Sequence, residues 1–403
     1  MRIMHIAWEY PPLVYGGLGR HVHALTVAQA AAGHDVMVIT DQHDDAADDS
    51  VVDGVRVIRE GRKPALPFEP EFLLRIVTAL DESLAASAAR HLRDFAPEVI
   101  HCHDWMTTRA GITASAAAGV PLVATIHATE WGRHQGYLHS EISRNVDSVE
   151  RFLAQSADGL IACSAAMRAE IATQFGVAPD VITVIPNGVD TDIWHTSMQQ
   201  KEQARRRWAP NGPLLTYSGR LEAEKGIFTM LDAMPQVLSE HPRARLVVAG
   251  NGGQSHQFDH DIVERGLAGS VVRSGWLPEA DLRALVGSAD AALVPSLYEP
   301  FGLVALEAMA LGAPVICART GGLVDIVDDG VTGLLFEPGN PTDLAAAIDR
   351  TLNDPAAAAE RAAAAAAPLQ ARFNWSNIAD ATVAEYRNVA ASVRGSAQES
   401  DGS

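Results

Sequence analysis

The sequence predicts an α/β protein made of two parallel sheets, each covered by helices on both faces. Short runs of Val, Ile, Leu and Ala recur between segments of helical character, and they are continuous rather than alternating, which is typical of strands buried on both faces. The length of 403 residues favours two domains, because a domain usually holds about 100–200 residues. Serine and aspartate recur around one apolar run in each half, at 156–164 and 288–296, which indicates two similar halves.

The first domain is expected at residues 1–190 and opens with a strand, a glycine turn and a helix. The apolar run 3–8 ends at two prolines, a glycine-rich turn follows at 16–19, and apolar residues then recur at helical spacing until Gly33. Together with a strand at 36–39 this pattern is a βαβ unit. Further strands of this domain are expected at 99–102, 122–126, 160–163 and 181–185.

The second domain is expected at residues 191–375, after a turn-rich joint at 186–190. A last helix is expected at 376–394, and residues 395–403 have the composition of a disordered tail. The strands of the second domain are expected at 214–217, 246–249, 291–294 and 315–317.

Composition and charge exclude several classes of protein. Fifty acidic residues against 31 basic ones give a formal net charge of −19, which argues against nucleic-acid binding because that needs clustered Lys and Arg. Three scattered cysteines are too few for a disulfide framework. The apolar stretch at the N-terminus is too short for a signal peptide or a membrane span, so a cytoplasmic protein is expected. Six aspartates at 41–53 are interpreted as a solvated surface turn rather than a metal site.

Two glycine-containing loops predict contacts with phosphate. Gly17 lies where a strand gives way to a helix, and the N-terminus of a helix offers unpaired N–H groups to an anion. Arg220 and Lys225 lie five positions apart between Gly219 and Gly226. Two cations at the carboxyl end of a parallel strand fit a diphosphate leaving group, although an ordinary solvated loop would contain the same residues.

Two glutamates flank the start of a further helix. Glu299 precedes this helix, which is expected to begin near Gly302, and Glu307 lies within it. Carboxylates accept hydrogen bonds from hydroxyl groups, and the backbone N–H groups of Leu303 and Val304 would face a phosphate. The alternative is that Glu299 is a capping charge and Glu307 a surface residue.

Histidines and arginines supply further candidates. His101 and His103 lie two residues apart at a strand end, so both could face one metal ion. Because no third ligand is nearby in the sequence, a role in the core or in a pocket is favoured. The arginines at 205–207 are interpreted as a solvated helix face, with docking to an acidic lipid surface as the alternative.

The combination of these motifs resembles one enzyme family. Their order and spacing are similar to those of the retaining glycosyltransferases of family 4 and the glycogen synthases, over residues 8–375. This resemblance implies the GT-B fold, in which two Rossmann-like domains face a central cleft and the last helix packs back on the first domain. The motifs are, in chain order, Gly17, the segment 187–190, Arg220 with Lys225, Glu299 with Glu307, and the segment 320–325.

The resemblance implies a nucleotide-sugar donor held largely by the second domain. Glu299 would hold hydroxyl groups of the donor sugar, and Glu307 the nucleotide ribose. The base would lie against Gly275, Trp276 and Leu277. The departing diphosphate would be neutralised by Arg220 and Lys225, helped by N–H groups of Gly17, Leu303 and Val304. Gly302 would also belong to the donor-binding residues.

On the first domain, His127 would line the sugar pocket beside the reacting carbon, and Asp104 would lie on the acceptor side. Enzymes of this kind keep the anomeric configuration, with attack on the face of the leaving group and a donor phosphate oxygen taking the acceptor's proton. Such chemistry needs cations and N–H donors more than a protein nucleophile. No cofactor is expected, and a divalent metal is expected to be dispensable because no Asp-x-Asp motif is placed to bind the sugar diphosphate.

Within the family the chain looks most like actinobacterial α-1,4-glucosyltransferases. This implies transfer of glucose from ADP- or UDP-glucose to the non-reducing end of an α-1,4-glucan or a related oligosaccharide. Val14 stands where bacterial glycogen synthases carry Lys, and Phe301 where they usually carry Cys, so the donor base stays open. The alternatives are a GDP-mannose-dependent mannosyltransferase with a lipid or oligosaccharide acceptor, a nucleotide-sugar epimerase, and an inactive sugar-nucleotide sensor. Membrane association is not expected outside the lipid-acceptor alternative, and the sequence leaves the oligomeric state open.

Overall fold

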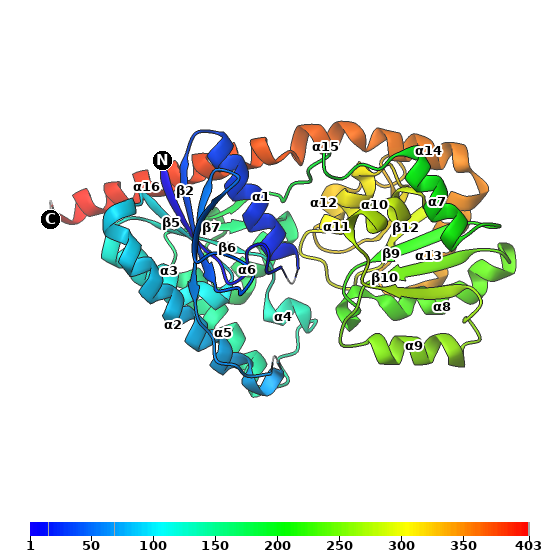
Figure 1. The fold of residues 1–403 in the computed structure, drawn as a ribbon, viewed down its shortest axis with the longest axis horizontal. Coiled ribbons are helices and arrows are strands. Elements are labelled where there is room, and N and C mark those ends of the chain that lie inside the picture. The colour runs from blue at the N-terminus through cyan, green and yellow to red at the C-terminus, as the bar shows by residue number, and fades with distance from the viewer. Residues whose placement is uncertain (15, 68, 402–403) are drawn as a thin grey trace. The chain divides into compact units, whose positions relative to one another are not determined.

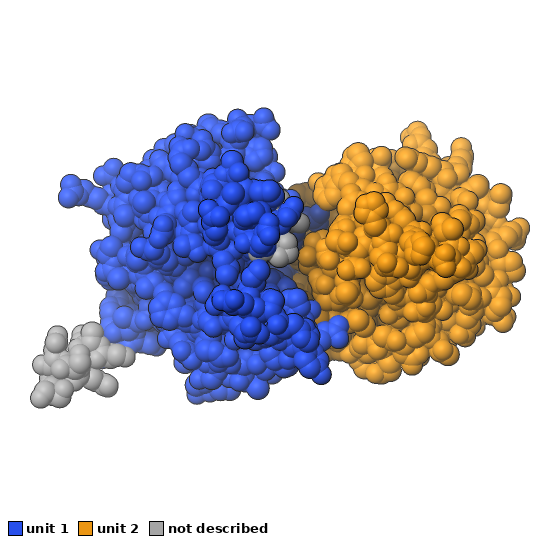
Figure 2. All heavy atoms as spheres, turned by 90° about the horizontal axis from the view of Figure 1, so that it is seen from below, with its two compact units in different colours: residues 1–188, 375–403 blue, residues 189–374 orange. Residues whose placement is uncertain are grey.

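The computed structural model describes residues 1–14, 16–67 and 69–401, and the chain divides into two compact units (Figure 2). Unit 1 holds Met1–Gly188 together with Trp375–Ser403, and unit 2 holds Val189–Asn374. These boundaries lie within two residues of those expected from the sequence. Both units are α/β, each with a sheet in which parallel pairing dominates (Figure 1).

Unit 1 contains an eight-stranded sheet in the order β3-β4-β2-β1-β5-β6-β7-β8. Every neighbouring pair is parallel except β3 and β4, which form an antiparallel edge. The strand order reverses between β1 and β5, because the chain adds strands outward from β1 on one side and from β5 on the other. The strands are β1 (Arg2–Ile6), β2 (Asp35–Asp41), β3 (Asp49–Val52), β4 (Val55–Gly61), β5 (Val99–His103), β6 (Leu122–Ile126), β7 (Gly159–Ala162) and β8 (Ile182–Val184).

Helices cover both faces of this sheet. One face packs against α1 (Gly17–Ala31) and α16 (Trp375–Asp401), whose Leu25 and Val383 meet Ile3 of β1 and Val123 of β6 in one apolar cluster. Figure 1 shows α16 running back along this unit. The other helices are α2 (Pro70–Phe95), α3 (Thr108–Ala118), α4 (Glu130–Arg133), α5 (Glu141–Ser156) and α6 (Ala165–Phe175), with 3₁₀ turns η1 (Trp105–Thr107) and η2 (Pro179–Val181).

Unit 2 contains a six-stranded parallel sheet in the order β11-β10-β9-β12-β13-β14. This is the doubly wound order 3-2-1-4-5-6, whose switch point lies between β9 and β12. The strands are β9 (Leu214–Ser218), β10 (Arg245–Ala249), β11 (Val271–Gly275), β12 (Ala291–Val294), β13 (Val315–Ala318) and β14 (Leu334–Phe336). The helices are α7 (Met198–Trp208), α8 (Ile227–Glu240), α9 (Ser255–Glu264), α10 (Glu279–Gly287), α11 (Leu303–Ala310), α12 (Leu323–Ile326), α13 (Pro341–Asn353), α14 (Pro355–Ala364) and α15 (Ala366–Arg372), with the 3₁₀ turn η3 (Ala223–Lys225).

Two local expectations were wrong. The aspartate-rich segment 41–53 is not simply a solvated turn, because Asp41 ends β2 in the buried interior, where it pairs with Lys63, and Asp49 begins the edge strand β3. The last helix does not end at Arg394 but continues to Asp401, so residues 395–401 are not a loose tail. Polar helix-forming residues follow Gly395, and a single glycine costs a helix only about 1 kcal/mol. In the described parts of the chain, neither α16 nor any other helix combines the length and apolarity that crossing a bilayer requires.

Candidate active site

The switch point of the unit 2 sheet brings two of the predicted loops together. The loop after β9 carries Arg220 and Lys225, and the loop after β12 carries Glu299. Because β9 and β12 are neighbours and parallel, their carboxyl ends open at the same edge of the sheet. In doubly wound sheets this is where ligands bind.

Lys225 and Glu299 form a largely buried ion pair at this edge. The Lys225 Nζ lies 2.9 Å from Glu299 Oε2, and the two side chains are only 19% and 9% exposed. Ser296 donates a second hydrogen bond to the same oxygen, at 2.9 Å. The loops also approach through their backbones, since a Cβ on Gly226 would lie 1.9 Å from the Pro295 carbonyl oxygen, at φ 64. Only glycine fits at this position, which explains why the loop that carries Arg220 and Lys225 ends with Gly226.

Arg220 lies in the same loop with a different partner. Its guanidinium is 3.2 Å from Glu224 Oε1, and its side chain is 54% exposed. The Tyr217 hydroxyl donates to the Arg220 carbonyl at 2.7 Å, so the tyrosine at the end of β9 holds the backbone of this loop. The sequence motif did not include Tyr217. Arg220 therefore offers an accessible cation in the same loop as the largely buried Lys225.

The structure excludes both alternatives for the glutamates. Gly302 is the N-cap of α11 and receives no side-chain cap, and Glu299 instead binds Lys225 and Ser296. Glu307 is 7% exposed, so it is not a surface residue. Leu303 and Val304 are the first residues of α11, as expected.

A third loop, after β13, supports Glu299 from behind. The Gly322 N–H donates to the Glu299 carbonyl at 2.9 Å. A Cβ on Gly321, at φ 50, would lie 1.9 Å from the same carbonyl oxygen. The two glycines are therefore required because the loop after β13 passes directly behind Glu299.

The residues expected near a base lie at the end of β11. Gly275 has φ 68, and its carbonyl accepts from Gly250 N–H at 2.9 Å. Trp276 is 75% exposed, which is unusual for so large an apolar side chain, and Leu277 packs partly into the core. Since β11 is two strands from β9, these residues lie farther from the switch point than Lys225 and Glu299 do.

In unit 1 the corresponding edge carries Asp104 and His127. Asp104 follows β5 and adopts φ 59 with ψ 175, a region that is almost confined to glycine and costs about 1–3 kcal/mol. Its Oδ1 accepts the backbone N–H of His127 at 2.7 Å. Burial raises the pKa of Asp104 to about 6, an effect opposed by Arg133 and by that hydrogen bond.

His127 is half-buried and neutral. Burial, reinforced by the charge of Arg133, lowers its pKa to about 3. Its Nε2 lies 3.3 Å from Nδ1 of His103, so the distal nitrogen faces the interior of unit 1.

Gly17 is the first residue of α1, and the buried Glu9 accepts the N–H of Gly19 at 3.2 Å, which places a carboxylate at this helix terminus. Glu9 was not among the predicted site residues.

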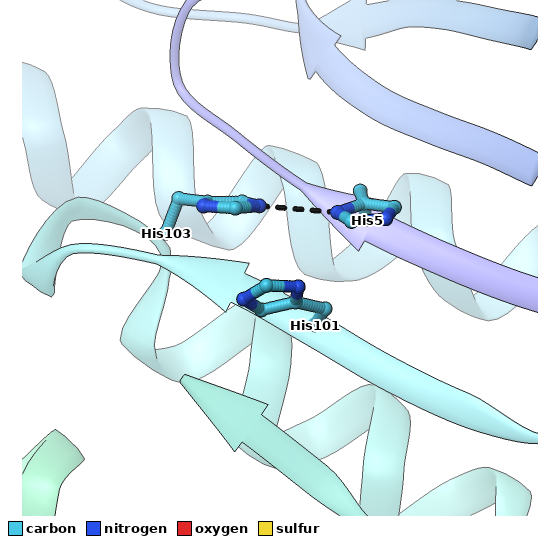
Figure 3. A group of neighbouring side chains, drawn as sticks. All are labelled: His5, His101 and His103. Carbon is cyan, nitrogen blue, oxygen red and sulfur yellow. Dashed lines mark hydrogen bonds between the residues drawn. The ribbon is translucent and has the colours of Figure 1, made fainter. Parts of the chain in front are cut away.

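A cluster of buried histidines lies beneath these residues. His101 and His103 are buried in the core, as favoured from the sequence, and β1 pairs with β5 and brings the distant His5 beside them (Figure 3). The only sequence signal was that His5 interrupts the apolar run of the first strand. Burial lowers the pKa of His5 to about 4 and those of His101 and His103 well below the usual range.

The basic stretch at 205–207 lies on α7 as a largely solvated helix face, with the Arg206 side chain 79% exposed. Arg205 lies 2.7 Å from Asp290 and donates to two carbonyls, Arg206 pairs with Glu202, and Arg207 stacks on Trp208. Each of these three cations therefore has a partner within unit 2.

A pocket of about 500 Å³ lies on unit 2 beside Pro213, Asp290 and Pro314. These residues precede β9, β12 and β13, so the pocket lies at the amino edge of the sheet. Ligands of doubly wound sheets bind at the opposite edge. The pocket is therefore not the candidate active site.

Comparison with known proteins agrees with this geometry. Residues 15–193 match the family described as Glycosyltransferase Family 4, and residues 198–367 match Glycosyl transferases group 1. The chain is 40% identical to a glycogen synthase of Mycobacterium tuberculosis (strain ATCC 25618 / H37Rv), covering 96% of this chain and 94% of that protein. It is 32% identical to an alpha-maltose-1-phosphate synthase of Mycolicibacterium smegmatis, covering 97% and 100%. Its fold matches sucrose-phosphate synthase from Thermosynechococcus elongatus with a TM-score of 0.82 at 27% identity, covering 97% and 100%.

Proposed function

The chain belongs to glycosyltransferase family 4 and is a retaining hexosyltransferase of GT-B fold, and from this we propose that it transfers glucose from a nucleotide-glucose donor to a glucan. The donor is ADP- or UDP-glucose, and the acceptor is the non-reducing end of an α-1,4-glucan or a related oligosaccharide. The similarity to a glycogen synthase over nearly the whole chain supports this choice.

The observation that carries the proposal is the Lys225–Glu299 pair at the switch point of unit 2. A departing diphosphate needs a cation that is already in place, and Lys225 is held there by two neighbouring loops. Glu299 keeps its carboxylate oriented through Ser296, ready to accept hydrogen bonds from sugar hydroxyls. Arg220 would turn from Glu224 toward the same phosphates.

In unit 1, His127 and Asp104 take the roles beside the reacting carbon and on the acceptor side. The neutral imidazole of His127 can donate or accept a hydrogen bond without adding charge next to the sugar. With no protein nucleophile assigned, the acceptor attacks on the face of the leaving group and a donor phosphate oxygen takes its proton. We assign no divalent metal to this step, because Lys225 and Arg220 supply the positive charge.

The test is a matrix of donors and acceptors. ADP-glucose, UDP-glucose and GDP-mannose are each offered with maltooligosaccharide, with glucose 1-phosphate and with a lipid acceptor, and the product linkage is identified. We expect an α-1,4-linked glucose on maltooligosaccharide with at least one glucose donor, and at least about 10²-fold slower transfer by Lys225→Ala at the same enzyme concentration.

Each other result has a definite meaning. Transfer of glucose to glucose 1-phosphate and to no other acceptor would identify a sugar phosphate as the acceptor instead of a glucan. The name of one relative, alpha-maltose-1-phosphate synthase, indicates such a product. Mannose transfer would overturn the donor assignment. An epimerised donor without transfer would overturn the proposed reaction.

A further inference from the structure

Unit 1 contains a hydrogen-bonded line of buried side chains that ends at His127. The line starts at Gln29, whose Nε2 donates to the Tyr386 hydroxyl at 3.2 Å and whose Oε1 lies 2.8 Å from His5 Nε2. His5 Nδ1 lies 3.1 Å from His103 Nε2, as the dashed line in Figure 3 marks. His103 Nδ1 then lies 3.3 Å from His127 Nε2.

The direction of the protons in this line follows from its first member. The Gln29 oxygen can only accept, so His5 carries its proton on Nε2 and has a lone pair on Nδ1. His103 Nε2 must then donate to His5, because two lone pairs do not bond. A neutral imidazole has one ring proton, so Nδ1 of His103 is left with a lone pair that points at His127.

His21 presents a second lone pair to the same place. Its Nδ1 lies 2.7 Å from the Asn187 Oδ1, which accepts the ring proton. Its Nε2 is therefore unprotonated, and it has no hydrogen-bond partner among the described residues although the side chain is only 4% exposed. A buried polar atom without a partner costs about 1–3 kcal/mol of stability. We therefore expect a ligand to bind at His21 Nε2.

His21, His103 and His127 lie close enough to share that occupant. One ring nitrogen from each lies within 4.8 Å of the others. His127 has one ring proton and can satisfy only one of the two lone pairs. A cation bound by all three nitrogens satisfies every one of them.

One of the three nitrogen–nitrogen separations matches zinc. Two imidazole nitrogens at about 2.0–2.1 Å from a tetrahedral zinc ion lie about 3.3 Å apart. His103 Nδ1 and His127 Nε2 are separated by 3.3 Å. The other ring nitrogens of His21 and His103 bind Asn187 and His5, an arrangement that fixes ligand orientation in zinc sites.

We infer that His21, His103 and His127 form a site for one zinc ion, with a fourth position open on the half-exposed side of His127. The neighbouring group of His5, His101 and His103 is less suitable. Both nitrogens of His101 are engaged, by the Tyr386 hydroxyl at 2.6 Å and by Thr125 Oγ1 at 2.7 Å, and none of these three rings is exposed.

The site has a consequence for transfer, and this step rests on the proposed function. Zinc on Nε2 of His127 fixes the ring and places positive charge beside the sugar pocket. Zinc would therefore inhibit the enzyme, and a chelator would restore activity. The ion is not needed for the reaction, in which the cations of unit 2 neutralise the phosphates.

The binding test uses the full-length protein freed of metal with a chelator and then dialysed against zinc. We expect about one zinc per chain, and binding weaker by at least about 10–100-fold in His21→Gln. His260→Gln, which alters an exposed histidine on α9, is the matched control and should retain the metal. Equal binding by wild type and His21→Gln, or no binding by wild type, would overturn the site.

Cobalt binding to the wild type keeps the test independent of how well the variant folds. A three-histidine site with one open position gives the intense visible bands of four-coordinate cobalt, whereas the weak spectrum of six-coordinate cobalt would overturn the site. Inhibition of transfer by zinc in wild type and His260→Gln, but not in His21→Gln, supports the link to His127. Zinc that binds without inhibiting overturns that link. If no donor supports transfer, the proposed function fails, while the metal content still decides on the site.

Discussion

Replacing Lys225 by alanine removes a cation that is held in place between the loops after β9 and β12 of unit 2. At 2.9 Å and an effective dielectric constant of about 20, a full charge pair is worth about 6 kcal/mol, an upper limit because water enters when the side chain is lost. Deleting a charge-stabilising group in other enzymes costs about 2.7–4 kcal/mol, or about 10²–10³-fold in rate. We therefore expect Lys225→Ala to lower kcat/KM by at least about 10²-fold.

The assay is the initial rate of nucleoside diphosphate release with the donor found in the matrix, checked by the amount of elongated maltooligosaccharide. Lys201→Ala is the matched control, because Lys201 lies in the same unit and donates to the Leu311 carbonyl, away from the switch point. It should retain activity within about threefold.

Glu299→Ala should lose activity on the same scale as Lys225→Ala. The double variant should lose less than the sum of the two free energies, since each change also removes the other's partner. A Lys225→Ala enzyme that unfolds like the wild type and transfers within about tenfold of it would refute the assigned role.

Three further predictions concern the backbone and buried carboxyl groups. Gly321→Ala should lower kcat/KM at least about tenfold, because its Cβ would collide with the Glu299 carbonyl. Gly330→Ala is the control and should keep its activity, because Gly330 is also at positive φ but its Cβ would have its nearest neighbour 4.0 Å away. Equal losses in the two variants would contradict this packing explanation. Asp104→Gly should be more stable to thermal unfolding than Asp104→Ala by about 1–3 kcal/mol, because only alanine retains the strain at φ 59, and equal stability would show that there is none. Burial raises the pKa of Glu150 to about 8, so its proton stabilises the fold fully below about pH 4.5, and this stabilisation is lost as the pH rises toward 8. Glu150→Gln should therefore flatten the pH dependence of the unfolding free energy by ~2–5 kcal/mol in urea titrations at about pH 5 and about pH 9, and an unchanged profile would contradict the raised pKa.

Among the described residues, the sequence predicted ten strands and missed four. The runs 122–126 and 291–294 agree with β6 and β12 to the residue, because a strand covered on both faces must be apolar throughout. β3, β4, β11 and β14 were missed. Three of them lie at sheet edges, where β3 is partly exposed, β11 includes the half-buried Arg273 and Ser274, and β14 has only three residues. β4 lies inside the sheet, but Arg56, Arg59 and Glu60 interrupt its apolar pattern.

The candidate site was predictable as separate motifs but not as an arrangement. Lys225 and Glu299 lie 74 positions apart, and only the adjacency of β9 and β12 brings them into contact. The histidine cluster was harder to predict, because His5 and His103 lie 98 positions apart and Tyr386 lies 285 positions from His101. Short-range patterns in the sequence do not indicate such contacts, because they arise from the strand order and from the return of the chain along α16.

The return of α16 also sets an order of events during synthesis. The ribosome releases all of unit 2 before it makes the helix that covers one face of unit 1. Until then Ile3, Val99 and Val123 lack the apolar partners that Ile378, Val383 and Tyr386 provide, although every strand of unit 1 has emerged. Unit 2 can fold on emergence, whereas the first-made domain is finished last. A chain truncated after residue 374 would therefore contain a complete unit 2 joined to a unit 1 with an uncovered apolar face. Chaperones and proteases recognise such exposed apolar surface.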